Sequence, residues 1–110
     1  MAFKEISQTS ELDQLFAESA DKPVILFKHS LTCPISHAAY EEMSNLTKEE
    51  VSLVIIQDAR SVSSEIEVRT GIRHESPQAF VVSEGKVAWH ASHYDITKAA
   101  VVRAIEGIKN

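Results

Sequence analysis

The chain is poor in cysteine, glycine and proline, with one cysteine, three glycines and three prolines in 110 residues. A single thiol excludes an internal disulfide, and therefore a disulfide-stapled scaffold or a redox site with two thiols in the same chain. The few glycines and prolines are spread out, and no repeat, low-complexity segment or linker separates them. A chain of this length buries a core without staples, so we expect one domain over residues 1–110.

Positive charge is also scarce. Lysine and arginine contribute 11 residues against 16 acidic ones, for a formal net charge of −5. The basic residues are scattered rather than gathered in a stripe, which argues against a nucleic-acid partner and against binding to an anionic membrane. The remaining composition, 44% hydrophobic and 25% charged, is typical of a globular protein.

No hydrophobic run approaches the length of a membrane span, and the opening "MAFKEISQTSELDQLF" carries charges where a signal peptide needs an apolar core. We therefore expect a cytoplasmic protein. One unpaired cysteine agrees with a reducing compartment.

Apolar spacing predicts four helices and four strands. The helices are expected at 9–20, 34–46, 61–70 and 95–108, and the strands at 23–27, 51–56, 78–82 and 86–90. Ser10 is expected to cap the first helix, with Asp13 in the capping-box position. The last two strands flank "SEG" and indicate an antiparallel hairpin. This order predicts the α/β class, with a mixed four-stranded sheet flanked by helices and an extra N-terminal helix.

The only cysteine, Cys33, lies where the first strand gives way to the second helix, in "VILFKHSLTCPIS". Pro34 follows it in the first helical position, which proline favours, so Cys33 is expected at the N-cap. Unpaired backbone N–H groups and the positive end of the helix dipole favour thiolate over thiol there. The pattern therefore predicts a reactive thiol, against the alternative of a small buried hydrophobe.

Ser36 stands one turn into this helix, where its hydroxyl is expected to donate a hydrogen bond to the sulfur. A second feature is Pro77 in "TGIRHESPQAFVV", directly before the third predicted strand. A cis bond there would leave the backbone of Ser76 free to pair with an extended substrate, but cis bonds are uncommon and the sequence alone does not establish one.

These motifs resemble the thioredoxin superfamily along essentially the whole chain. More narrowly, "FKHSLTCPIS" and "RTGIRHESPQAFVV" resemble the YtxJ-like monothiol bacilliredoxin family. The resemblance implies a thioredoxin-like fold, a cis Pro77 beside Cys33, and thiol–disulfide oxidoreductase activity on mixed disulfides between proteins and bacillithiol. Ser36 then occupies the place of the resolving cysteine of dithiol relatives, which excludes an internal two-thiol route.

The expected catalytic residues are Cys33, Pro34 and Ser36, and the expected substrate-binding residues are Thr32, Ser76, Pro77 and Lys28. Lys28 is a possible anchor for a carboxylate of the small thiol, although a solvated lysine at a strand end is an equal reading. The expected partners are bacillithiolated proteins, with bacillithiol as co-substrate or an external reductase. No resident cofactor is expected.

A metal site is a further alternative, because His29, Cys33 and His37 are spaced four apart. No fourth ligand is apparent, and His29 leaves a strand rather than the same helix. We therefore expect no metal, with His37 on the exposed face near the thiol.

Three other functions stay open. A monothiol glutaredoxin-like protein acting on glutathione mixed disulfides needs the same attacking thiolate. An iron–sulfur cluster carrier is disfavoured by Pro34, because cluster-binding relatives typically have glycine after the cysteine. A non-catalytic thioredoxin-like interaction module would have an ordinary thiol.

Overall fold

Helices and strands alternate along most of the chain in the computed structural model, which describes residues 2–109. The elements are β1 Ala2–Glu5, α1 Thr9–Glu18, β2 Val24–His29, α2 Pro34–Ser44, β3 Glu50–Ile55, α3 Arg60–Thr70, β4 Gln78–Ser83, β5 Lys86–Ser92, a short 3-10 turn η1 His93–Asp95, and α4 Lys98–Lys109.

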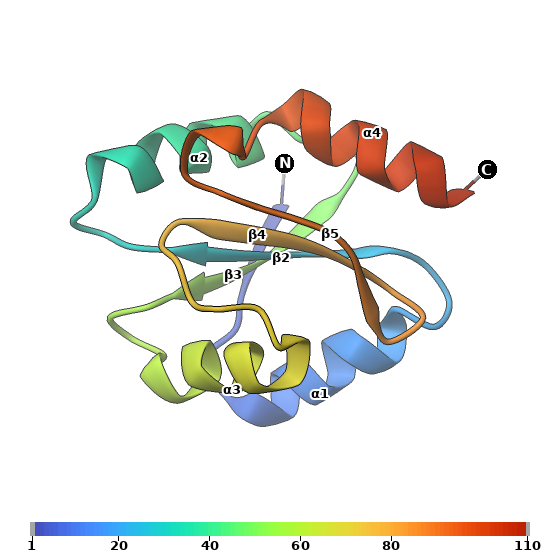
Figure 1. The fold of residues 1–110 in the computed structure, drawn as a ribbon, viewed down its shortest axis with the longest axis horizontal. Coiled ribbons are helices and arrows are strands. Elements are labelled where there is room, and N and C mark those ends of the chain that lie inside the picture. The colour runs from blue at the N-terminus through green and yellow to red at the C-terminus, as the bar shows by residue number, and fades with distance from the viewer. Residues whose placement is uncertain (1, 110) are drawn as a thin grey trace.

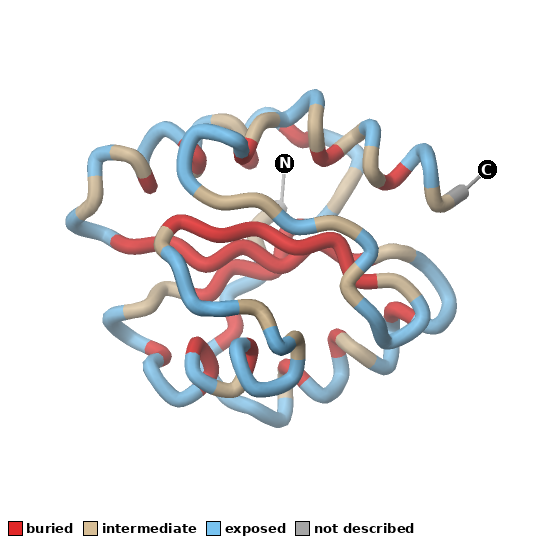
Figure 2. The backbone as a smooth tube through the Cα atoms, in the orientation of Figure 1, coloured by how far each residue is buried: buried red, intermediate tan, exposed pale blue. Residues whose placement is uncertain are grey.

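The strands form one mixed sheet in the order β1-β3-β2-β4-β5. β3 runs parallel to both β1 and β2, whereas β4 runs antiparallel to β2 and to β5. Helices α2 and α4 cover one face and α1 and α3 the other (Figure 1). The central strands are buried between these layers, as the burial colouring of Figure 2 shows.

The expected count of four strands with an extra N-terminal helix is wrong. Residues Ala2–Glu5 form β1, so α1 links two strands of the sheet. β1 is an edge strand, with β3 as its partner. The aromatic ring of Phe3, in β1, packs on the ring of Tyr40 in α2, with ring centroids 4.7 Å apart.

The start of α1 also differs from the prediction. The N-cap is Gln8 rather than Ser10, and Glu11 rather than Asp13 closes the capping box. The Glu11 carboxylate accepts the backbone N–H groups of Ser7 and Gln8 at 3.0 and 3.1 Å. The predicted capping signature was therefore displaced by two residues, whereas the helix itself begins at Thr9, as the apolar spacing indicated.

The predicted hairpin is confirmed. β4 and β5 pair antiparallel through Ser83 and Lys86. The two residues between them, Glu84 and Gly85, both have positive φ, at 53° and 75°. Two such residues in a two-residue connection match the twist of the paired strands.

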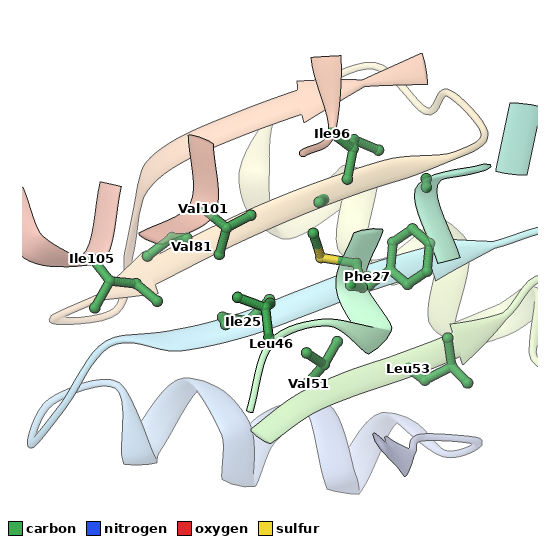
Figure 3. Packing of buried hydrophobic residues seen from close by; sticks show 12 residues of the cluster. Ile25, Phe27, Leu46, Val51, Leu53, Val81, Ile96, Val101 and Ile105 are labelled. Atoms are coloured by element: carbon green, nitrogen blue, oxygen red, sulfur yellow. The ribbon is translucent and has the colours of Figure 1, made fainter. Parts of the chain in front are cut away.

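Side chains of β2 alternate between two apolar clusters. Ile25 and Phe27 face α2 and α4 (Figure 3), whereas Val24 and Leu26 face α1 and α3. This period of two also decides where the last two residues of the strand point. The side chain of Lys28 lies on the face of the sheet covered by α3, and the side chain of His29 lies on the face covered by α2.

Candidate active site

Cys33 occupies the N-cap of α2, as predicted. Its backbone is extended, with φ −101° and ψ 119°, and Pro34 opens the helix behind it. The Cys33 carbonyl accepts the first helical hydrogen bond, from the His37 N–H at 3.1 Å. Cys33 is partly exposed, and Thr32 and Pro34 on either side are exposed. Reagents in solvent therefore meet the thiol at the start of a helix.

Ser36 is fully buried, and its hydroxyl has other partners than the one we expected. The Ser30 N–H donates to Ser36 Oγ at 2.9 Å, and His29 Nδ1 lies 2.8 Å from the same oxygen. Within the described residues, the thiol of Cys33 makes no capping hydrogen bond at the start of α2. The predicted donation from Ser36 to the sulfur is therefore wrong.

His29 is buried beside this hydroxyl. Burial lowers the pKa of His29, and the nearby charge of His37 lowers it further. Ser36 Oγ therefore has two buried polar partners, the Ser30 N–H and His29 Nδ1. The imidazole packs on Tyr40, with centroids 4.9 Å apart. Ser36 thus joins the end of β2 to the first turn of α2.

The loop between β2 and α2 has a further support that the sequence did not reveal. Gln57, after β3, donates from Nε2 to Ser30 Oγ at 3.0 Å and accepts the Leu31 N–H at 3.2 Å. On the other side of the loop, His37 Nε2 lies 3.1 Å from the Leu31 carbonyl. No motif in the sequence contains Gln57, and only the three-dimensional pairing of β2 with β3 brings it here.

The peptide bond between Ser76 and Pro77 is cis, which confirms the expectation from the resemblance. Lys28 and Gln78 are register partners, so this turn and the Cys33 loop lie at the same edge of the sheet. Gln78 is buried and holds the turn by donating to the Arg73 carbonyl at 3.0 Å and accepting from the Glu75 N–H at 3.4 Å.

Ser76 brings a polar atom to this edge. Its hydroxyl oxygen is buried and has no hydrogen-bond partner among the residues 2–109 that the structure describes. Buried polar atoms are nearly always paired, so this hydroxyl is an exception within the described residues.

Lys28 does not present a solvent-facing anchor for a small thiol. Its side chain has 0% exposure, and the ammonium donates to the Ser63 carbonyl of α3 at 3.4 Å. Burial lowers the pKa of Lys28 to about 8, and Glu67 opposes this shift. The cause is the strand alternation, which turns position 28 away from the face that carries α2.

The remaining predicted residues are placed as follows. Thr32 is exposed, and its hydroxyl lies 3.5 Å from Ser30 Oγ. His37 is exposed on the first turn of α2, as expected. Within residues 2–109, no group of three or more metal-binding side chains is suitably placed for an ion. None of the described helices is long and apolar enough to cross a membrane.

Comparison with known proteins identifies the family and the fold. A family model described as monothiol bacilliredoxin BrxC matches residues 4–101. The chain is also similar to a solved structure that is described as having a thioredoxin fold, with a TM-score of 0.87 and 32% identity over 94% of this chain and 93% of that chain.

Thioredoxins are similar in fold alone. The Fasciola hepatica protein has a TM-score of 0.73 at 14% identity, covering 97% of this chain and 98% of its own. The Trypanosoma brucei brucei protein has a TM-score of 0.77 at 11% identity, covering 98% and 91%. The fold is that of thioredoxin, the function is thiol–disulfide redox chemistry, and the chain belongs to the monothiol bacilliredoxin family of the BrxC model.

Proposed function

We propose that the protein removes bacillithiol from mixed disulfides on cytoplasmic proteins, by monothiol exchange through Cys33. The observation that carries the proposal is the position of the only thiol. It is partly exposed at a helix N-cap, on the same sheet edge as a cis-proline turn, in a chain of the bacilliredoxin family.

The first step is an attack by the Cys33 thiolate on the bacillithiol sulfur of a modified protein. A new S–S bond forms between Cys33 and bacillithiol, the S–S bond to the protein breaks, and the protein leaves as a thiolate that takes up a proton. In the second step a bacillithiol thiolate attacks this adduct. Oxidised bacillithiol forms and the Cys33 thiolate is released; an external reductase is the alternative electron donor for this step.

The helix N-terminus assists both steps. Its dipole and unpaired N–H groups favour the attacking thiolate in the first step and the leaving thiolate in the second. Pro34 starts the helix without an N–H of its own, and its fixed φ keeps Cys33 at the cap. The chain has no second thiol, so a thiol of another molecule must resolve the adduct on Cys33.

We assign contacts with the modified protein to Thr32, Ser76 and Pro77. Thr32 is exposed next to the thiol, and Ser76 is partly exposed before the cis bond, where its backbone is expected to pair with an extended segment. Bacillithiol acts as co-substrate, and the chemistry needs no resident cofactor.

A Cys33→Ser variant tests the mechanism. We expect it to lose removal of bacillithiol from a modified test protein, because serine is far less nucleophilic than a thiolate at pH 7. Mass spectrometry of the test protein follows the loss of the thiol. Wild-type protein alkylated at Cys33 is the matched control, since it keeps the native sequence. Removal by Cys33→Ser at the wild-type rate would contradict the proposal.

A further inference from the structure

Two consecutive residues of the loop before the thiol are hydrogen bonded to one side chain from the turn after β3. Gln57 Nε2 donates to Ser30 Oγ at 3.0 Å, and Gln57 Oε1 accepts the Leu31 N–H at 3.2 Å. The neighbouring Ile56 N–H donates to the His29 carbonyl at 3.0 Å. The segment after β3 therefore binds the end of β2 and the loop that follows it.

The opposite side of this loop is held by α2. Ser36 Oγ accepts the Ser30 N–H at 2.9 Å, and His37 Nε2 lies 3.1 Å from the Leu31 carbonyl. Ser30 and Leu31 are thus fixed between Gln57 and the first turn of α2. Only Thr32 separates them from Cys33, so the placement of the thiol at the N-cap depends on where these two residues are held.

We propose that Gln57 is a positioning residue for Cys33. The inference rests on the proposed function. Gln57 acts on the sulfur through its hydrogen bonds to Ser30 and Leu31. The stabilisation of a thiolate by a helix N-terminus falls off within the first turn, so a loop that drifts moves the sulfur out of the favourable field. Small displacements of a reacting group carry large rate effects.

The test uses an aromatic disulfide, dithiobis(nitrobenzoate), as the probe. The Cys33 thiolate forms a mixed disulfide with half of the reagent, the S–S bond of the reagent breaks, and coloured thionitrobenzoate is released. Stopped-flow rates from pH 5 to pH 10 are compared for wild type, Gln57→Ala, Ser30→Ala and the double variant. Gln14→Ala is the matched control, because Gln14 is an exposed glutamine of α1.

We expect Gln57→Ala to react about fivefold to tenfold more slowly than wild type at pH 7. The rates should converge near pH 10, where the thiol is ionised in every variant. Ser30→Ala should show part of the effect, and the double variant should be no slower than Gln57→Ala, because the two side chains share one hydrogen bond. Every variant keeps His29 and His37, the two histidines next to this loop.

Two results would overturn the inference. One is a profile for Gln57→Ala that matches the Gln14→Ala control. The other is a uniform slowing at all pH values together with a lower melting temperature, which would make Gln57 a merely structural residue. The probe is not bacillithiol, so the role of Gln57 can be tested even if the protein does not act on bacillithiol. Failure of the Gln57 inference would likewise leave the bacillithiol proposal untouched.

Discussion

Ser36 is a buried serine in the first turn of α2, close in sequence to Cys33. Its hydroxyl is fully buried and saturated by the Ser30 N–H and His29 Nδ1. The position therefore supports the end of β2 and the loop before Cys33, rather than the sulfur. A buried hydroxyl with both partners in place contributes through satisfied hydrogen bonds whose loss would leave two buried groups unpaired.

Spacing predicted the position of Ser36 in the first turn of α2, but it could not predict its partner. The direction of a side chain within that turn depends on how the helix packs against β2, which is a tertiary property. Lys28 illustrates the same limit. Its place at the end of a strand was predictable, but which side of the strand faces which helix was decided by the sheet as a whole.

Lys28 supports a prediction on pH and stability. Burial lowers the pKa of Lys28 to about 8 in the folded protein, against an ordinary lysine value of 10.5. Between these values the unfolded chain binds a proton that the folded chain lacks, so this group makes stability rise with pH across that window. Below pH 8 the folded protein carries the full penalty of a buried ammonium.

We therefore expect Lys28→Met to raise the free energy of unfolding at pH 7 by roughly 1–3 kcal/mol. The gain over wild type should shrink between pH 8 and pH 10, as the wild-type amine becomes neutral. Urea unfolding at pH 7 and pH 10 measures both values. Lys22→Met, at an exposed lysine, is the matched control and should show neither effect. A Lys28→Met variant destabilised at pH 7 would contradict this reading.

At the scale of elements, apolar spacing predicted every helix and all strands except one. β1 was missed because its four residues, AFKE, include two charges and one large apolar side chain. Such a segment has too little pattern to indicate a strand. Pairing with β3 and the contact of Phe3 with Tyr40 stabilise it, and neither can be read locally.

The end of α3 was predictable because it depends on one residue. Gly71 follows the last helical turn with φ 69°, and its N–H donates to the Glu67 carbonyl at 2.9 Å. A left-handed residue after a helix is usually glycine, since a Cβ atom is strained in that conformation.

A pair of glycine substitutions tests this assignment. Gly71→Ala should lower the free energy of unfolding by about 1 kcal/mol, although a Cβ atom there meets open space. Gly107→Ala, inside α4 and also facing open space, should raise it by about 0.5–1 kcal/mol, because alanine is the better helix former. Urea unfolding of both variants gives the two signs. Equal signs would mean that backbone conformation does not decide the effect at these positions.

At the scale of the whole molecule, the pairing of β2 with β4 brings the two halves of the site to one edge. The Cys33 loop follows the end of β2, and the Ser76–Pro77 turn precedes the start of β4. Because the strands are antiparallel, these two segments meet although they are far apart in the chain. The resemblance to bacilliredoxins predicted this edge, whereas spacing alone indicated only the thiol and a proline before a strand.

The most direct test of the central claim measures the adduct on the thiol. The protein is exposed separately to oxidised bacillithiol and to oxidised glutathione, and mass spectrometry follows the mixed disulfide on Cys33 with time. We predict that the bacillithiol adduct on Cys33 forms faster than the glutathione adduct. Absence of a bacillithiol adduct, or one that forms no faster than the glutathione adduct, would contradict the account.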